Sequence, residues 1–239
     1  MAMSELAERF YVPVASIEQI RSVVRKEKWA HRRSAQELAQ SWFGRQAIPL
    51  RVQRALDACG EFGHTRIVRG VFEHGDLLNG PPGPSRTDLM LHIVSGSAPG
   101  VIAIEGKVDE GFDHPVRTWL LRGKKGSESR PARLRYLGSC LGIEIPHGSS
   151  LRYQLIHRTV SAISEARRCG AKRALMLVHA FTLNNPKCDP KKAQVQKTHF
   201  CEFGQAMKVK MPSADGIHGP ITVDGVRLWF GWVDDAPAN

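Results

Sequence analysis

The stretch that decides the fold runs from Arg86 to Val108 and reads RTDLMLHIVSGSAPGVIAIEGKV. Its first nine residues alternate between two faces, as expected for a β-strand that is buried on one side. Residues 95–100 are rich in Ser, Gly and Pro, which favours a turn. The apolar run VIAIEGKV that follows has the length and composition of a second strand. The stretch therefore predicts a β-hairpin that carries charges at one end.

Three of these charged residues are expected to lie close together. A symmetric turn centred between Ser97 and Ala98 would place Asp88 opposite Lys107, with Glu105 as the diagonal neighbour. Because side chains two residues apart share a sheet face, all three groups would lie within about 5 to 8 Å of one another at Cβ.

Two carboxylates at this distance repel each other unless a proton or a cation lies between them. Mg²⁺, or Mn²⁺ in its place, fits because it prefers oxygen ligands such as Asp88, Glu105 and the backbone carbonyl of Gly106. Lys107 could then orient a water molecule or help to deprotonate it. The alternative is a surface salt bridge on a half-exposed strand.

This arrangement resembles the PD-(D/E)XK, or restriction-endonuclease-like, nuclease superfamily. The motif of that superfamily is an Asp on the second core strand and Glu-x-Lys on the third, and it stands here as TDLML from Thr87 and IEGKV from Ile104. Thr87 replaces the nominal Pro, and Gly106 stands where an apolar residue is more usual. The resemblance implies metal-dependent hydrolysis of nucleic acid and a core of helix, three strands, helix and strand over residues 34–181.

The resemblance also implies further site residues. Many members carry a metal-binding Glu on the first core helix, for which Glu37 is the matching position, although a role in capping that helix explains it equally well. On the helix after the motif, Gln154 is the expected catalytic residue. The residues expected to contact nucleic acid are Tyr153, His157 and Arg158 on that helix and Lys124 and Lys125 in a basic stretch before it.

Directly after the motif come Asp109, Glu110 and Asp113, followed by His114. These residues could add a second metal ligand. A solvated acidic loop is the interpretation we favour.

The remaining sequence places this hairpin in an α/β fold. Capping-box patterns at Ser16 with Gln19 and at Ser34 with Glu37 predict helices in the first sixty residues. Further expected elements are a helix from Pro49 to Gly60, a strand over 65–72, short helices within 117–145, a helix over 151–168, a buried strand over 174–181, and a hairpin at Asp224-Gly225. We predict one domain with a mixed central sheet flanked by helices: a helical part over 1–60, a nuclease-like core over 34–181 and an extension over 182–239.

Composition limits the class of partner. The 239 residues include 34 Lys and Arg against 23 Asp and Glu, a net charge of +11 that favours a polyanion, and DNA is the form of nucleic acid we expect. The five cysteines form no C-x-x-C pair, and no apolar run is long enough to span a membrane. We therefore expect a cytoplasmic protein that contacts no membrane. The resemblance also implies that the chain forms a homodimer, because many such enzymes pair to cut both strands.

Two alternatives stay open at this stage. The chain could be a catalytically inactive, nuclease-like protein that binds nucleic acid or regulates a larger system. Its basic face could instead meet an acidic protein.

Overall fold

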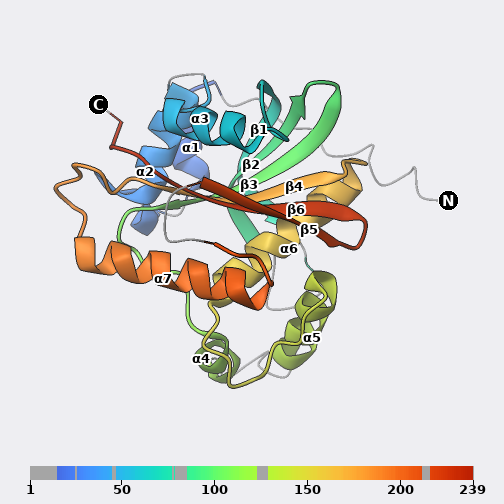
Figure 1. The fold of residues 1–239 in the computed structure, drawn as a ribbon. Coiled ribbons are helices and arrows are strands. Elements are labelled where there is room, and N and C mark those ends of the chain that lie inside the picture. Colours follow the sequence, from blue (N-terminus) through green and yellow to red (C-terminus); the bar gives the residue numbers. More distant parts are fainter. Residues whose placement is uncertain are drawn as a thin grey trace.

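In the described residues, one six-stranded sheet organises the protein, with parallel pairing at its centre and antiparallel pairing at both edges. The computed structural model describes residues 15–24, 26–44, 47–76, 78, 85–122, 129–211 and 216–238. The strands are β1 (Thr65–Asp76), β2 (Ser85–Ser95), β3 (Ala98–Lys107), β4 (Arg173–Ala180), β5 (Gly216–Val223) and β6 (Val226–Asp234). They lie in the order β1-β2-β3-β4-β6-β5 (Figure 1).

The predicted mixed sheet is confirmed. β2 pairs antiparallel with β1 and β3, while β4 pairs parallel with β3 and β6. The terminal hairpin of β5 and β6 turns at Asp224 and Gly225, both with positive φ, as a two-residue hairpin turn requires. All eight residues of β4 are buried, because the strand is covered on both faces.

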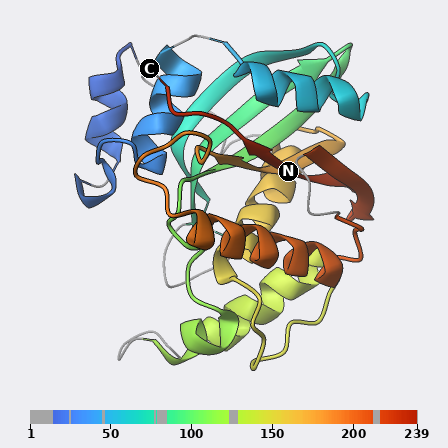
Figure 2. The same ribbon diagram turned by 60° about the vertical axis from the view of Figure 1, so that its left-hand side comes forward.

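Helices cover both faces of this sheet (Figures 1 and 2). On one side lie α1 (Ile17–Val23), α2 (Ser34–Ala39) and α3 (Leu50–Cys59), with short helical turns at Lys26–Lys28 and Gln40–Gly44. On the other side lie α4 (Val116–Leu121), α5 (Ser129–Leu141), α6 (Tyr153–Arg168) and α7 (Pro190–Ala206). No helix in the described ranges is both long enough and apolar enough to cross a membrane.

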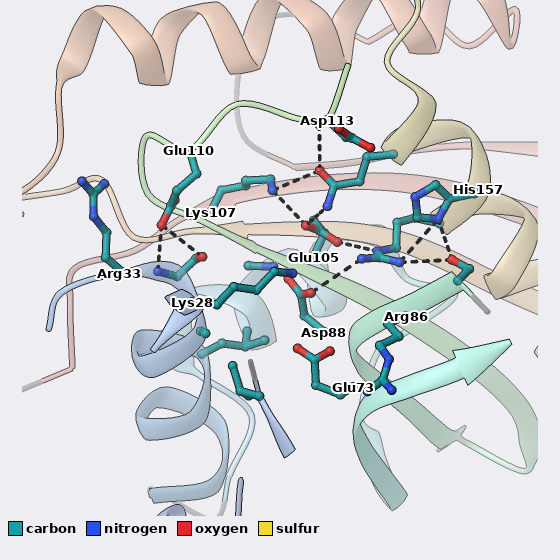
Figure 3. Close-up of a pocket in the computed structure, with 18 of the residues that line it drawn as sticks. Lys28, Arg33, Glu73, Arg86, Asp88, Glu105, Lys107, Glu110, Asp113 and His157 are labelled. Carbon is teal, nitrogen blue, oxygen red and sulfur yellow. Dashed lines mark hydrogen bonds and ion pairs between the residues drawn. The ribbon is translucent and has the colours of Figure 1, made fainter. Parts of the chain in front are cut away.

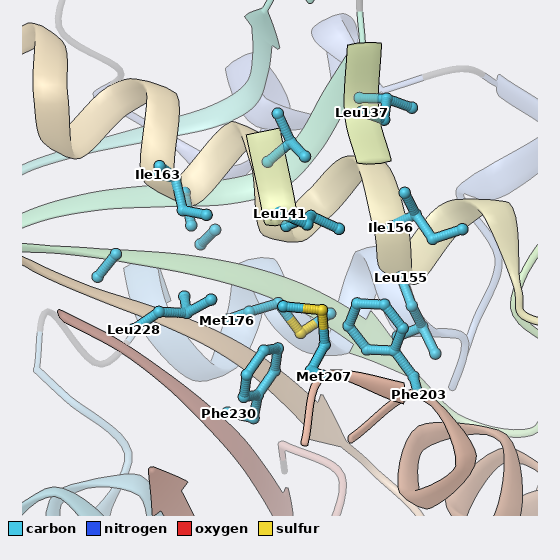
Figure 4. Close-up of a cluster of buried hydrophobic side chains, with 14 of the residues drawn as sticks. Leu137, Leu141, Leu155, Ile156, Ile163, Met176, Phe203, Met207, Leu228 and Phe230 are labelled. Atoms are coloured by element: carbon cyan, nitrogen blue, oxygen red, sulfur yellow. The ribbon is translucent and has the colours of Figure 1, made fainter. Parts of the chain in front are cut away.

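The two layers of helices enclose separate hydrophobic cores. The larger core packs α5, α6 and α7 onto the sheet through residues such as Leu137, Ile156, Met176 and Phe203 (Figure 4). The smaller core packs α2 and α3 onto the opposite face of β2, β3 and β4. Because α6 is anchored along the sheet by its apolar residues, the polar side chains of its first turns are held over the end of β3.

Of the two predicted capping patterns, one is confirmed and the other is not. Ser16 caps α1 as expected, since its Oγ accepts the backbone N–H of Gln19. The expected capping box of α2 is wrong: the helix begins at Ser34, whose N–H and hydroxyl both donate to the Glu110 carboxylate at 3.2 Å. An acidic side chain from a distant loop therefore performs the capping, which releases Glu37 for other contacts.

Candidate active site

The site lies where β2 begins and β3 ends. Leu89 pairs with Ile104, so continuing this register by one residue brings Asp88 opposite Glu105. The predicted pairing of Asp88 with Lys107 is wrong by two residues, because the turn consists of Gly96 and Ser97 alone. A shift of two residues leaves every side chain on its original face, so the expected meeting of the charges survives.

Glu105 is at the centre of the hydrogen bonds in the site. Its carboxylate is 2% exposed, and Oε1 accepts a bond from Lys107 Nζ at 2.8 Å and another from Gln154 Nε2. Oε2 accepts a bond from Arg158 Nε at 2.5 Å. Burial alone would raise the pKa of Glu105, but Arg158 and Lys107 hold this pKa at about 2, so Glu105 is ionised at neutral pH.

The negative charge of Asp88 is less well compensated by its neighbours than that of Glu105. Its Oδ2 accepts the backbone N–H of Gly106 at 3.0 Å, and its Oδ1 lies 3.7 Å from Arg158 Nη2. Burial, followed by the nearby charge of Glu105, raises the pKa of Asp88 to about 7 against the opposing effects of Arg158 and Lys107. Arg158 and Lys107 match the two carboxylates in number, but burial and the closeness of Glu105 still favour an added proton or cation at Asp88.

Gln154 fixes the position of the lysine. Its Oε1 accepts bonds from Lys107 Nζ and from the backbone N–H of Asp113, both at 3.2 Å, while its Nε2 faces Glu105. The ammonium of Lys107 is thus held between two acceptors. The expected catalytic residues Asp88, Glu105, Lys107 and Gln154 meet at one place.

These groups form the floor of a cleft of about 1040 Å³ (Figure 3). Around the carboxylates, its walls carry Lys28 and Arg33 from the helical layer before β1 and Arg86 from β2, together with the acid Glu73. Arg86 was not among the predicted site residues, although it lies two residues before Asp88 on the same strand and therefore on the same face of the sheet. This spacing is the signal that could have identified it.

Arg158 has a role different from the expected contact with nucleic acid. The residue is 4% exposed, and its guanidinium bonds Glu105, lies near Asp88 and donates to Ser85 Oγ at 3.2 Å. In this arrangement Arg158 is the internal counter-cation of the two carboxylates. Its distance of 53 residues from Glu105 along the chain left no local pattern from which to infer the pair.

Tyr153 and His157 are also turned inward. The Tyr153 ring stacks on Trp119 with centroids 3.8 Å apart, and the residue is 6% exposed. His157 Nδ1 lies 2.6 Å from Ser85 Oγ, and burial lowers the pKa of this imidazole well below its usual value, so the ring is neutral at neutral pH. Both residues line the cleft, but their polar or aromatic groups are already engaged with the protein. Lys124 and Lys125 lie outside the described residues.

Glu37 is not part of the site. It is 1% exposed, its Oε2 accepts the backbone N–H of Ala238 at 2.7 Å, and its Oε1 lies 3.8 Å from Arg32. Burial raises the pKa of Glu37 in spite of these contacts. Its expected role as a metal ligand is therefore wrong for this arrangement, because the carboxylate joins α2 to the C-terminal segment.

The acidic residues after the motif build the loop. Asp109 pairs with Arg33 and accepts the N–H of Asp189, and Glu110 caps α2 as described above. Asp113 is largely exposed and binds the N–H of His114. The favoured interpretation as a loop is supported, although Asp109 and Glu110 are structural anchors rather than freely solvated charges.

Gly106 is explained by packing on the opposite face. A Cβ at this position would lie 3.3 Å from the backbone oxygen of Ser34 and 3.5 Å from Leu38. The missing side chain lets α2 approach β3 closely, and α2 in turn forms one wall of the cleft. This packing gives a reason for the glycine that does not require its carbonyl to bind a ligand.

In the part of the chain that the structure describes, no group of three or more His, Cys, Asp and Glu side chains is arranged to hold a metal ion. The acidic pair of Asp88 and Glu105 falls short of that number by one side chain. Any ion at this pair would therefore complete its coordination with backbone oxygens, water or substrate.

Comparison with known proteins identifies the family. Residues 13–237 match the family described as Domain of unknown function (DUF6946), and the chain belongs to it. No curated protein and no solved structure matches the chain significantly.

Proposed function

We propose that this member of the DUF6946 family is a metal-dependent nuclease that hydrolyses phosphodiester bonds of nucleic acid, with DNA as the expected substrate. One observation carries the proposal: Asp88 and Glu105 face each other on the floor of an open cleft, with the ammonium of Lys107 bonded to Glu105. This is the arrangement that the PD-(D/E)XK resemblance implies.

The donor set fits a hard divalent cation such as Mg²⁺ or Mn²⁺. The hydrogen bonds of Glu105 use three of the roughly four lone-pair positions of a carboxylate, and Asp88 accepts one hydrogen bond, at 3.0 Å. Burial and the charge of Glu105 raise the pKa of Asp88, so an added cation beside this oxygen pair would be favourable. Asp88 and Glu105 would hold the ion, which supplies Lewis acidity that stabilises negative charge on phosphate oxygens and makes water more acidic.

The chain supplies orientation and charge for the same reaction. Lys107, fixed by Glu105 and Gln154, presents an ammonium that can orient the attacking water and stabilise a phosphorane-like oxyanion. Lys28, Arg33 and Arg86 on the cleft walls supply positive charge along the path of a phosphate backbone.

The test is cleavage of supercoiled plasmid in Mg²⁺ by the wild type and by Lys107→Ala. We expect the variant to nick at least about 100-fold more slowly, because a positioned charged group is removed from the reacting centre. Lys172→Ala is the matched control, since Lys172 is exposed and does not line the cleft. Equal rates for the wild type and Lys107→Ala would remove the proposal.

A second candidate function is favoured by Arg158. Its guanidinium already bridges Glu105 and Asp88. It therefore neutralises the charge that a divalent ion would otherwise neutralise. A protein that relies on this arginine would be an inactive nuclease-like fold that binds or regulates nucleic acid. Salt-dependent DNA binding without cleavage in Mg²⁺, Mn²⁺ or Co²⁺ would identify it.

The proposed setting is the cytoplasm, with two copies of the chain acting together on the two strands. All five cysteines are free thiols, which suits a reducing compartment. Sedimentation of the protein with and without DNA measures whether the homodimer forms.

A further inference from the structure

A second, smaller pocket of about 350 Å³ lies behind the loop that follows β3. The loop is shared by the two hollows: Glu110, Gly111 and Asp113 line the cleft, whereas Asp109, Gly111 and Phe112 line the pocket. The start of α6 is shared in the same way, since Arg152 lines the pocket and the two residues after it line the cleft. A ligand in the pocket would therefore be a close neighbour of a substrate in the cleft.

The pocket is positively charged because Arg152, Lys191 and Lys192 contribute to its lining. His199 adds an imidazole whose pKa is lowered by burial and by Arg152, so this ring is neutral at neutral pH. The acid in the lining, Asp109, is already engaged on both oxygens, by Arg33 and by the backbone N–H of Asp189.

The neighbours of Arg152 compensate little of its positive charge. Burial and the neighbouring Arg117 lower the pKa of Arg152, and only the exposed acid Glu202 opposes them. The Arg152 guanidinium contacts His199 Nε2 at 2.7 Å, a pairing that brings no negative charge. An anion is the missing partner.

Three buried polar atoms in the lining have no hydrogen-bond partner among the described residues: Arg152 Nε, His199 Nδ1 and Gln196 Oε1. Gln196 is 1% exposed, and its Nε2 donates to the carbonyl oxygen of Glu110, which fixes the amide with its oxygen unpaired. A buried polar group without a partner costs free energy, so these atoms indicate a ligand that brings oxygen acceptors for the Arg152 and His199 nitrogens and a hydroxyl or water for Gln196.

We propose that this pocket binds a phosphate group of the nucleic acid, next to the phosphate that is cleaved. The volume lies at the small end of the range for ligand pockets and suits one nucleotide rather than a duplex. The assignment to nucleic acid rests on the proposed function, whereas the assignment to phosphate rests on the pocket alone. The phosphate could be a terminal monoester or an internal diester.

The test uses the full chain in EDTA, so that binding is measured without cleavage. Fluorescence anisotropy follows short duplexes and single strands that end in phosphate or in hydroxyl, for the wild type and for Lys191→Gln/Lys192→Gln/His199→Gln. We expect the triple variant to bind about tenfold more weakly and its salt dependence to fall by about one phosphate contact or more. A preference of the wild type for phosphate ends, lost in the variant, assigns a terminal phosphate; an equal loss for both ends assigns an internal one.

The control is Lys172→Gln/Lys210→Gln, which removes two exposed charges away from both hollows. Equal weakening by the control and the pocket variant would overturn the proposal. Lys191→Gln/Lys192→Gln serves where the triple variant does not fold, because both lysines are exposed.

A parallel measurement separates this proposal from the nuclease function. Inorganic phosphate at constant ionic strength should raise the melting temperature of the wild type and the control, and should not raise that of the pocket variant. A phosphate effect without DNA cleavage keeps the pocket and removes the nuclease. Cleavage with no phosphate effect and no difference in DNA binding keeps the nuclease and removes the pocket.

Discussion

Buried carboxylates lie among basic side chains at both ends of α6, but only the cluster at the N-terminal end opens into the cleft. At the C-terminal end, Glu165 is 4% exposed and is surrounded by His92 at 2.7 Å, His74 at 3.4 Å and Arg168. At the N-terminal end, two carboxylates, Asp88 and Glu105, share Arg158 and Lys107.

The difference lies in the number of carboxylates and in access. The Glu165 cluster holds one carboxylate beside Arg168 and two imidazoles, of which His74 is neutral at neutral pH, and none of these residues lines the cleft. The other cluster holds two carboxylates, and burial together with the charge of Glu105 raises the pKa of Asp88 to about 7. Because this cluster opens into the cleft, one end of α6 has a structural contact and the other has a candidate reactive centre.

The largest expected effect contrasts the two glutamates. Glu105→Gln should reduce plasmid cleavage in Mg²⁺ by at least about 100-fold, because it removes the charge that holds Lys107 and would hold the ion. Glu165→Gln should leave cleavage within about twofold of the wild type and act on stability instead. Comparable losses of activity in the two variants would show that the ends of α6 are not functionally distinct.

A smaller effect contrasts the two arginines. Arg158→Gln should lower the free energy of unfolding by about 3 to 5 kcal/mol, because it leaves buried carboxylates without a partner. Arg168→Gln should cost about 1 kcal/mol or less, since the Arg168 side chain is 37% exposed and its ion pair is screened by solvent. Urea unfolding measures both changes.

Added Mg²⁺ extends this comparison. The ion should restore part of the lost stability in Arg158→Gln and should have no such effect on Arg168→Gln. Stabilisation of both variants to the same extent would contradict a cation site at the N-terminal end.

The smallest expected effect concerns the pH dependence of folding stability, to which Asp88 and His74 contribute with opposite signs. Asp88, with a folded pKa of about 7 against an ordinary 3.8, keeps a proton that the unfolded chain loses, so its contribution to stability falls as the pH rises from about 4 to 7. His74 has a folded pKa of about 4 because of burial and Arg168, so the unfolded chain binds the extra proton below pH 6.5. Its contribution to stability rises from about pH 4 to 6.5.

Relative to the wild type, Asp88→Asn should therefore become more stable with rising pH, and His74→Gln less stable, by on the order of 1 to 3 kcal/mol across these windows. Differences from the wild type are the quantity to measure by urea unfolding at each pH. His157 and His179 also have lowered pKa values, but they are present in the wild type and in both variants, so their contributions cancel in these differences. Slopes of the same sign in the two variants would contradict the contrast.

The sequence predicted which charged residues meet at the site more reliably than it predicted the contacts of the residues around them. Asp88, Glu105 and Lys107 were placed on one face even though the predicted register was wrong by two residues, because a shift of two preserves the face. Glu37 matched a family position and a capping pattern, yet the structure gives it neither role. Glu110 supplies the cap instead, and the backbone of Ala238, 201 residues further along the chain, takes the Glu37 carboxylate.

The sequence by itself determined the strands, the shared face of three charges, the excess of basic residues and the order of elements along the chain, since each of these follows from local periodicity or composition. Only the tertiary structure decided that Arg158 would neutralise the carboxylates, that Gln154 would hold Lys107, and that a basic pocket would lie behind the loop. The physical reason is that α6 and α7 reach the end of β3 through the packing of their apolar faces. The polar groups that this packing brings together are far apart in the chain and leave no pattern within it.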